Sequence, residues 1–402
     1  MRYFALATDF DGTLATHGHV DEPAIAALRK LAASGRKLLM VTGRELTELA
    51  AAFPEISLFD WVVAENGALL FQPSTGEERL LAEAPSVEFL AALRNRGVSP
   101  VSVGRVIVAT WTPHEVAVLE SIRDLGLALN VIFNKGAVMV LPTGVTKATG
   151  LLAVLRIMGL SPHNVVGIGD AENDHALLAA CGCSAAVANA LPPVKERADI
   201  VTAGDHGAGV MEVIERLLKN DLADVPVSRG RREVRFQVEK REHRVPAFGV
   251  NLRFIETGAA GSSAAATAFV DGLLKAGYQF CLLQFHEGTL CREQAVVLGA
   301  ADSEPTVDEV AAALADPAAN VIVKLAALKA SKRTAYVSDL FIKVAALRKS
   351  CGRPHWLLLD DAAETARAVK KLPPGGVAII GPPPGASPQP ASPVEILTIA
   401  DT

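Results

Sequence analysis

Short apolar runs alternate with longer amphipathic segments over residues 1–220 of the chain. Four of the runs are almost wholly apolar, namely 3–8, 37–41, 61–64 and 164–169. Between the first two runs, residues 22–34 have the apolar spacing of a helix and end before Gly35. Apolar runs of this length, separated by amphipathic helices, are typical of parallel strands buried between two helical layers. The pattern therefore predicts an α/β fold.

Polar groups lie where these predicted strands end. They are Asp9, Asp11, Thr42, Gly43, Arg44, Asn66, Asp170, Asn173 and Asp174. Ligands of open α/β sheets bind beyond the carboxyl ends of the strands. There, hydroxyl and backbone N–H groups can donate to a phosphate oxygen, and carboxylates can converge on one cation. Because oxygen ligands suit Mg²⁺, the sequence predicts a site for Mg²⁺ and a phosphate group.

Lys147 lies at the start of another predicted helix, after the plausible N-cap residue Thr146. The helix dipole disfavours a cation in the first turn, so Lys147 is expected to face an anion. The alternative is a lysine whose ammonium simply reaches solvent. The segment in which Lys147 stands, described next, favours the first interpretation.

Four segments resemble, in order, the four motifs of the haloacid dehalogenase superfamily, most of whose members are Mg²⁺-dependent phosphohydrolases. They are Asp-Phe-Asp-Gly-Thr-Leu at 9–14, Thr-Gly-Arg at 42–44, Gly-Val-Thr-Lys at 144–147 and Gly-Asp-Ala-Glu-Asn-Asp at 169–174. The run Glu65-Asn66-Gly67-Ala68 resembles the Cof-type branch, where it lies beside the active site, although Asn-Gly also favours a plain hairpin turn. The resemblance covers about residues 1–219 and implies a Rossmann-like core formed by 1–71 and 145–219.

The resemblance also implies a role for each motif residue. Asp9 would be the nucleophile that forms an aspartyl-phosphate, and Asp11 the general acid and base. Mg²⁺ would be held by Asp9, Asp11 and Asp170, with Asp174 acting through a water or orienting Lys147. The groups expected to hold the phosphate are Asp11, Thr42, Gly43, Lys147 and Asn173.

Residues 72–144 have a different pattern, with helices predicted at 87–96 and 113–125 and strands at 105–110, 129–133 and 137–141. This small α+β insertion is of the kind that Cof-type relatives use as a cap over the site, where it would exclude water and contact the leaving group. Substrate contacts are expected from Arg44, Asn66, Asn134 and Lys135, with Trp111 and His114 as further candidates. For each cap residue alone, a structural role in the cap is the competing interpretation.

Residues 220–248 are rich in charge and predict a solvated linker, with an edge strand at 233–238. A second α/β pattern occupies 249–402, with strands at 250–255, 279–285, 355–361 and 394–399. A Gly-rich segment at 258–263 leads into a helix ending near Gly277, and a Pro-rich tail spans 381–390.

This second half resembles the P-loop ATPase domain that accompanies some bacterial phosphatases. The match fails at the two P-loop residues that bind phosphate and Mg²⁺. The phosphate-binding lysine would fall at Ala264, and the Mg²⁺-binding hydroxyl would fall at Ala265. Without those groups, phosphoryl transfer loses its main charge stabilisation. We therefore expect a degenerate P-loop domain that does not hydrolyse ATP and binds it weakly or not at all.

The bulk composition narrows the remaining choices. A chain of 402 residues suggests two or three domains, and a net charge of −5 argues against a nucleic-acid partner. The five cysteines are odd in number and lack zinc-like spacing, so reduced thiols and a cytoplasmic location are expected. Neither a signal peptide nor a membrane-spanning run is predicted.

The sequence predicts a Mg²⁺-dependent phosphomonoesterase whose partner is a small phosphorylated metabolite, such as a sugar phosphate or a related phosphoester. One alternative is a phosphomutase, which shares the motifs and returns the phosphoryl group to a sugar. The other is a regulatory protein without turnover, against which the four intact motifs argue.

Overall fold

The computed structural model describes residues 1–225, 233–238, 240–255, 264–285, 292–300, 303–360, 375–381 and 396–400. The chain forms two compact units, 1–226 and 227–402, each of which is described by itself. In the described part of the chain, no helix is both long enough and apolar enough to cross a bilayer.

The first unit is built on an eight-stranded sheet with the order β12-β11-β10-β1-β2-β3-β4-β5. The strands are β1 (Ala5–Thr8), β2 (Lys37–Val41), β3 (Trp61–Ala64), β4 (Leu69–Gln72), β5 (Glu77–Leu80), β10 (Val165–Gly169), β11 (Cys183–Ala186) and β12 (Ile200–Val201). All neighbours from β12 to β3 pair in parallel, and β4 and β5 add an antiparallel edge. Every residue of β1 and β10 is buried, as the apolar runs predict for central parallel strands.

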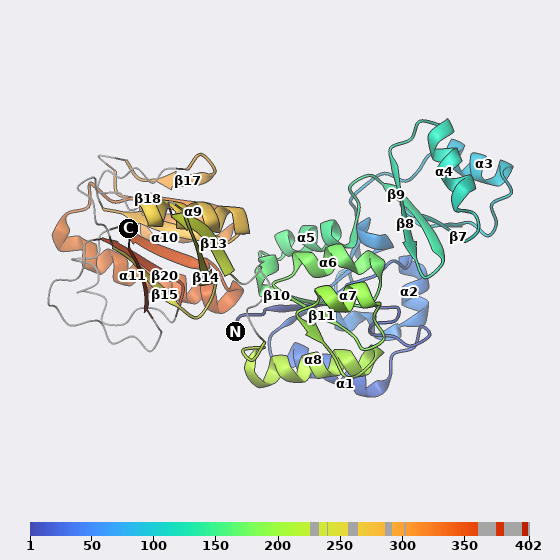
Figure 1. The fold of residues 1–402 in the computed structure, drawn as a ribbon, viewed down its shortest axis with the longest axis horizontal. Helices are drawn as coiled ribbons and strands as arrows, with labels where there is room; N and C mark the ends of the chain where they lie inside the picture. The colour runs from blue at the N-terminus through green and yellow to red at the C-terminus, as the bar shows by residue number, and fades with distance from the viewer. Residues whose placement is uncertain are drawn as a thin grey trace. The chain divides into compact units, whose positions relative to one another are not determined.

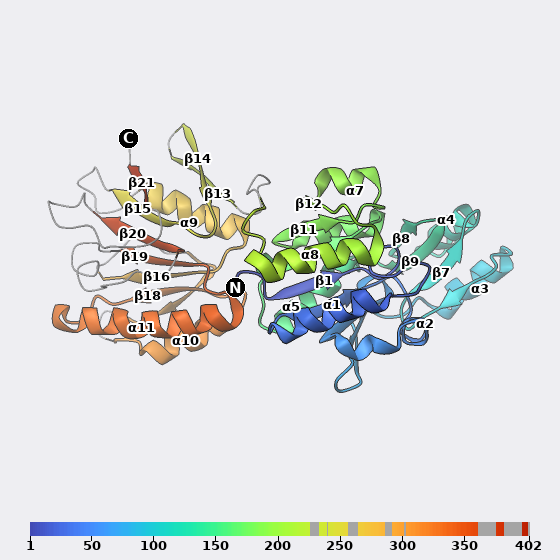
Figure 2. The same cartoon turned by 90° about the horizontal axis from the view of Figure 1, so that it is seen from below.

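Helices cover both faces of this sheet. They are α1 (Glu22–Ala33), α2 (Leu46–Ala52), α5 (Lys147–Ile157), α6 (His175–Ala180), α7 (Pro192–Arg197) and α8 (His206–Asn220), with short 3-10 turns η1 (Pro54–Leu58), η2 (Glu65–Gly67), η3 (Pro162–Asn164) and η4 (Glu172–Asp174). Helices α1 and α8 lie together on one face, and α5 and α6 on the other (Figures 1 and 2). The predicted α/β core is confirmed in this unit.

A four-stranded antiparallel sheet, with the order β6-β7-β9-β8, projects from the core between β5 and α5. The cap, as we call residues 81–144, contains α3 (Val87–Asn95), β6 (Ser102–Val103), β7 (Val108–Trp111), α4 (Glu115–Asp124), β8 (Leu129–Asn134) and β9 (Ala137–Pro142). The insertion predicted at 72–144 also includes β5, which pairs with β4 in the core sheet instead. Both helices pack on one face of the sheet through Phe89, Leu93 and Val118. The opposite face, with Met139 and Leu141, packs on Ala68 of the core.

The predicted cap elements are present, with shifted ends. The predicted strand 105–110 begins later, at Val108, because residues 105–107 are held by a side chain of the core instead of a neighbouring strand. Strand β6 was missing from the prediction, since its two residues carry no readable alternation.

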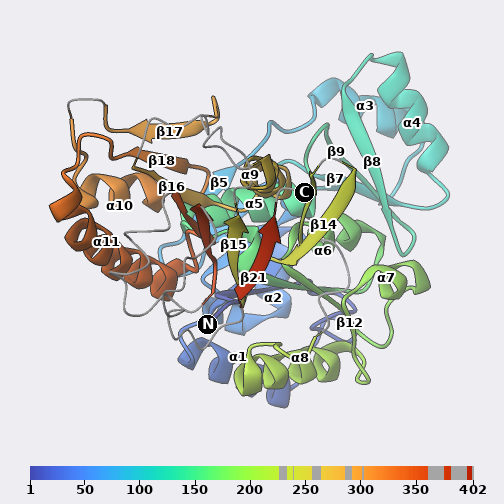
Figure 3. The same cartoon turned by 60° about the vertical axis from the view of Figure 1, so that its left-hand side comes forward.

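The second unit contains a seven-stranded, wholly parallel sheet with the order β17-β18-β16-β19-β20-β15-β21. Its strands are β15 (Asn251–Ile255), β16 (Phe280–Gln284), β17 (Ala295–Leu298), β18 (Asn320–Lys324), β19 (Trp356–Asp360), β20 (Val377–Gly381) and β21 (Ile396–Ala400). Helix α9 (Ala264–Ala276) covers one face, and α10 (Val307–Ala315) and α11 (Ala330–Cys351) cover the other (Figure 3).

The charged segment expected as a linker contains an antiparallel hairpin of β13 (Glu233–Val238) and β14 (Arg241–Pro246). Val234, Phe236 and Val238 are buried against α9, whereas alternate residues face outward. The predicted strand at 233–238 is therefore confirmed, and the hairpin packs on the second unit instead of standing free in solvent. The N-terminal part of the segment, through Val225, packs on the first unit.

The expected Gly-rich loop at 258–263 and nearly all of the Pro-rich tail at 381–390 lie outside the described residues, as do Arg229, Arg231, Arg232, Glu239 and Asp361. The helix predicted after the loop is present as α9, which begins at Ala264 and ends before Gly277. The relation of this unit to P-loop ATPases stays a prediction.

Candidate active site

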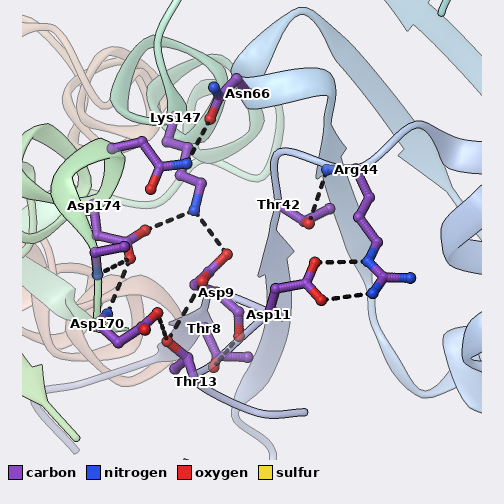
Figure 4. Close-up of polar contacts among 12 residues, drawn as sticks. Thr8, Asp9, Asp11, Thr13, Thr42, Arg44, Asn66, Lys147, Asp170 and Asp174 are labelled. Carbon is purple, nitrogen blue, oxygen red and sulfur yellow. Dashed lines mark hydrogen bonds and ion pairs between the residues drawn. The ribbon is translucent and has the colours of Figure 1, made fainter. Parts of the chain in front are cut away.

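The carboxyl ends of three neighbouring strands bring the predicted acids and hydroxyls together. Strand β1 lies between β2 and β10, so Asp9, Thr42 and Asp170 leave the sheet side by side. All three residues are buried, as is Asp174 in the turn after β10. Figure 4 shows the ammonium of Lys147 joined to the carboxylates of Asp9 and Asp174, with the Asp170 carboxylate joined to Thr13.

Lys147 is held at the start of α5 by a capping box. The Thr146 hydroxyl accepts from the Thr149 backbone N–H, and the Thr149 hydroxyl accepts from the Thr146 N–H. Two glycines let this helix approach the β3 turn, because a Cβ on Gly67 would overlap the Thr146 carbonyl and one on Gly150 would lie 2.5 Å from the Val63 side chain. The sequence-based expectation that Lys147 faces an anion is confirmed by its contacts.

The Lys147 Nζ donates to Asp9 Oδ1 and to Asp174 Oδ1, each at 2.7 Å. Its side chain is only 1% exposed, so the ion pairs replace hydration almost completely. Burial alone would lower the pKa of Lys147, but attraction to Asp174 and Asp9, with both hydrogen bonds, raises it above its ordinary value. The lysine therefore remains a cation.

Asp9 has the opposite electrostatic situation. Burial, followed by repulsion from Asp174, raises its pKa to about 8, although the Lys147 ammonium opposes the shift. Without a further cation nearby, the Asp9 carboxyl group therefore loses its proton only at a higher pH than an exposed aspartate does.

Asp174 acts as an acceptor for the backbone as well as for Lys147. Its Oδ2 accepts from the N–H groups of Asp170 and Ala171, at 3.0 and 3.1 Å. These bonds fix the turn after β10, so Asp174 orients Lys147 and supports Asp170. Of the two roles expected for Asp174, the geometry contains the orienting one.

Thr13 is a site residue to which the sequence analysis assigned no role of its own. Its hydroxyl lies 2.9 Å from Asp170 Oδ1 and 3.4 Å from Asp9 Oδ2, and the residue is fully buried. A threonine that contacts two acids cannot be a solvent-facing turn residue. Its place in the hexapeptide 9–14 was the only signal available for it.

Asp9, Asp170 and Asp174 can each offer one oxygen within 4.8 Å of the others, all from buried residues. Buried carboxylates at this separation repel one another unless cations neutralise them. Hard oxygen donors with excess negative charge fit Mg²⁺. The residues present therefore fit the predicted cation.

Asp11 does not join this cluster in the structure. Its carboxylate points to Arg44 and forms a bidentate ion pair, with both N–O distances at 2.6 Å (Figure 4). The hydrogen bonding of the Arg44 guanidinium, which donates to this carboxylate, is the main reason that the pKa of Arg44 is raised. Arg44, which was expected to contact substrate, thus holds Asp11. Thr42 lies beside the pair, and its hydroxyl accepts from the Arg44 N–H at 3.1 Å.

Asn66 lies at the edge of the site and also forms part of a hairpin turn, so both interpretations of the Asn-Gly run hold. Strands β3 and β4 pair antiparallel around it, and its φ is +56°. Its Oδ1 accepts from Asn173 Nδ2 at 3.1 Å, and its Nδ2 lies 3.4 Å from Met139 Sδ of the cap. The Asn173 Oδ1 is buried with no partner among the described residues.

Cap residues reach the site unequally. Lys135 Nζ lies 2.6 Å from Asp170 Oδ2 and 3.3 Å from the Asp11 carbonyl oxygen. Asn134 Oδ1 is buried without a partner in the described part of the chain. His114 lies 2.9 Å from the Ser99 carbonyl, which is a contact inside the cap, and Trp111 is 55% exposed.

Glu65 is a second residue whose role the sequence did not indicate. It is 1% exposed, and its carboxylate accepts from the N–H groups of Arg105, Val106 and Ile107 at 2.8 to 2.9 Å. We call this contact the Glu65 clamp, because it ties a core turn to the cap segment before β7. No local pattern reveals it, since its partners lie 40 to 42 residues away.

Comparison with known proteins shows which family the first unit resembles. The family model for haloacid dehalogenase-like hydrolases matches residues 6–98 and 119–214. A phosphoglycolate phosphatase from Methanothermobacter thermautotrophicus is 33% identical over 224 residues, which are 53% of this chain and 98% of that protein. Phosphoglycolate phosphatase 2 from Saccharolobus solfataricus is 30% identical, over 54% of this chain and 93% of its own length.

A third relative, the phosphoglycolate phosphatase of Halorubrum lacusprofundi, is 34% identical over 53% of this chain and 96% of its own length. A crystal structure from Thermoplasma acidophilum matches 54% of this chain and 99% of its own, with 18% identity and a TM-score of 0.49. The α/β core and the relatives together define a hydrolase of phosphoric monoesters. The chain belongs to the family of haloacid dehalogenase-like hydrolases, and the predicted class of enzyme is confirmed.

Proposed function

We propose that the first unit is a Mg²⁺-dependent phosphomonoesterase that acts on a small phosphorylated metabolite through an aspartyl-phosphate on Asp9. The observation that carries the proposal is the buried Lys147 ammonium, 2.7 Å from both Asp9 and Asp174, beside a third buried acid. The Lys147 ammonium lies against Asp9 Oδ1 and stabilises negative charge there. The other oxygen, Asp9 Oδ2, is left to attack the phosphorus atom.

Asp9 is the nucleophile in this account. Its carboxylate attacks phosphorus, the P–O bond to the leaving group breaks, and the phosphoryl group is carried on Asp9 until water releases it. Lys147 holds the carboxylate in position through Oδ1 and stabilises charge on the transferred group. Because Asp9 is buried, its carboxylate is shielded from water before the substrate binds.

The cation would be held by Asp9, Asp170 and the Asp11 carbonyl oxygen. When bound, Mg²⁺ supplies electrostatic attraction that offsets the repulsion between an anionic nucleophile and an anionic phosphate ester. Thr13 would then orient the Asp170 carboxylate, because its hydroxyl bonds Oδ1 and leaves Oδ2 on the other side.

Asp11 would donate a proton to the leaving oxygen and later accept one from the attacking water. Both of its carboxylate oxygens accept from Arg44 in the structure. Proton delivery therefore requires one of these bonds to be exchanged for the leaving oxygen. Arg44 is a positioning residue for Asp11 in this account.

The phosphate oxygens would be held by the Thr42 hydroxyl, the Gly43 N–H and Asn173. Asn173 has its amide nitrogen on Asn66 and an unpartnered Oδ1 among the described residues. A donor role toward phosphate requires that the amide turn from Asn66 to the ligand. Asn66 and Asn134 would contact the remainder of the substrate.

The three relatives support a small substrate, because each is a phosphoglycolate phosphatase that this chain covers almost entirely. We propose phosphoglycolate and sugar phosphates as the first substrates to assay. Free phosphate as the product, with no isomerised sugar phosphate, would separate a phosphatase from a phosphomutase.

The test is phosphate release from this panel by the full chain, with Mg²⁺ and with EDTA, for the wild type and Asp9→Asn. We expect Mg²⁺-dependent release by the wild type and loss of all but trace activity in the variant, because an amide cannot attack phosphorus. Asp124→Asn, at an exposed cap position, is the matched control and should retain activity. Equal release in EDTA, or an active Asp9→Asn, would contradict the proposal.

A further inference from the structure

The hairpin of β8 and β9 ends in a two-residue turn that belongs to the cap. Asn134 pairs with Ala137, and the turn residues between them, Lys135 and Gly136, have φ values of +50° and +89°. Positive φ at both positions is the geometry of the tightest hairpin turns, which leave little freedom at the tip. The turn therefore presents Lys135 in one direction.

That direction is into the core. The Lys135 Nζ lies 2.6 Å from Asp170 Oδ2, and the two side chains are 47% and 2% exposed. It also lies 3.3 Å from the Asp11 carbonyl oxygen. A Cβ at Gly12 would overlap the ammonium, so the glycine leaves the space that Lys135 enters. The end of β8 rests on the turn η4 beside the same acids.

Two of the oxygens that hold the ammonium are those assigned above to Mg²⁺, namely an Asp170 oxygen and the Asp11 carbonyl. A monovalent and a divalent cation that share both of these oxygens lie close together and repel each other strongly, so binding of one disfavours the other. One of them must leave. The ammonium is the one with an open side to solvent, through the exposed part of its side chain.

From this competition we propose that Lys135 is a cap latch that takes the place of Mg²⁺ in the metal-free enzyme and is displaced when Mg²⁺ binds. The inference rests on the metal site of the proposed function. In the metal-free state the ammonium compensates the buried Asp170 carboxylate and fastens the hairpin tip to the core. Metal binding breaks this contact and releases the tip.

The latch lowers the apparent affinity for Mg²⁺, because binding must first displace the ammonium. It also links the metal to the cap, since the displaced residue is at the rigid tip of the hairpin. The released Lys135 ammonium then lies between the cap and the leaving group of the substrate. There it can attract a substrate that is an anion.

Calorimetric titration of MgCl₂ into metal-free protein tests the competition without any turnover. We expect Lys135→Met to bind Mg²⁺ more tightly than the wild type by up to about fivefold, the upper end for an ion pair with an exposed partner. Lys135→Arg, which keeps the charge, should remain nearer to the wild type. Arg123→Met removes a cation of helix α4 that pairs with Asp124 and has no place in the proposed latch. This control should leave the affinity for Mg²⁺ unchanged.

Hydrogen exchange of residues 131–138, with and without Mg²⁺, tests the release of the tip. Exchange in the wild type should rise on adding Mg²⁺, whereas Lys135→Met should exchange fast under both conditions. Equal or weaker Mg²⁺ binding by a folded Lys135→Met, or tip exchange that Mg²⁺ leaves unchanged in the wild type, would overturn the latch while the metal site stands. Absence of Mg²⁺ binding to the wild type would overturn both.

Discussion

At the scale of single residues, the proposed chemistry depends on the protonation of two buried groups, Asp9 and Lys147. Asp9 loses hydration and faces Asp174, and its pKa rises from the ordinary 3.8 to about 8 even with Lys147 beside it. Lys147 itself stays protonated because the same two acids attract it. Removing one partner of such a buried ion pair costs several kcal/mol, because the other charge is left buried and unpaired.

This shift gives the metal-free protein a pH dependence with a definite sign. Between about pH 4 and pH 8 the folded state holds a proton on Asp9 that the unfolded state has released. The free energy of unfolding in EDTA should therefore fall as pH rises through this window. Urea unfolding of the wild type and Asp9→Asn measures it. The variant should show a flatter profile, and two superimposable profiles would contradict the assignment.

Among secondary-structure elements, the core turn η2 is joined to the cap segment 105–107 by hydrogen bonds to one side chain, Glu65. The Glu65 carboxylate satisfies three backbone N–H groups, two of them buried. Hydrogen bonds to a charged acceptor are among the stronger ones, and unmet buried donors are costly. The clamp should thus hold the base of the cap in register with the active site.

Glu65→Ala should lower the free energy of unfolding by about 2–4 kcal/mol and speed hydrogen exchange at residues 105–107. The reason is that three donors lose their acceptor at once. Glu78→Ala removes the exposed partner of the Arg105 side chain and serves as control, with an expected change below about 0.5 kcal/mol. Similar unfolding energies for both variants would show that the clamp does not stabilise the cap.

Elements with strong local signals could be predicted from the sequence, and contacts between distant elements could not. The ends of β2 and β3 and the start of α5 follow from apolar runs and from the Thr146 cap. The motif residues Asp9, Lys147 and Asp170 lie together as their order implied. The ion pair of Arg44 with Asp11, the clamp of Glu65 and the contact of Lys135 with Asp170 depend on how the cap and loops fold back, which no local pattern encodes.

At the scale of the whole molecule, the residues proposed for catalysis all belong to the first of two units. The C-terminal end of the first unit includes residues after α8. Asp221 accepts from Arg36 at 2.9 Å and from the backbone near the N-terminus. Leu222 and Val225 are buried in the core. The sequence alone suggested that the phosphatase ends near Asn220. The packing of these residues moves the end of the folded unit to about Pro226.

A fragment of residues 1–226 should keep the kcat of the full chain on a small phosphoester, whereas 1–220 should unfold at a lower temperature. The shorter fragment leaves the buried Arg36 guanidinium without its carboxylate partner and uncovers apolar surface. Thermal unfolding and phosphate release of both fragments measure this. A folded but inactive 1–226 would mean that the second unit contributes to the site.

The central claim is that a phosphoryl group is transferred to Asp9, and its most direct test is to observe that group. Asp11→Asn should accumulate the intermediate with an aryl phosphate, whose leaving group needs no proton, because release by water needs the missing base. After acid quenching, mass spectrometry should find one phosphoryl group, formed only with Mg²⁺, on the peptide that contains Asp9. A phosphoryl group on another residue, or an enzyme that releases phosphate while Asp9 is never modified, would contradict the account.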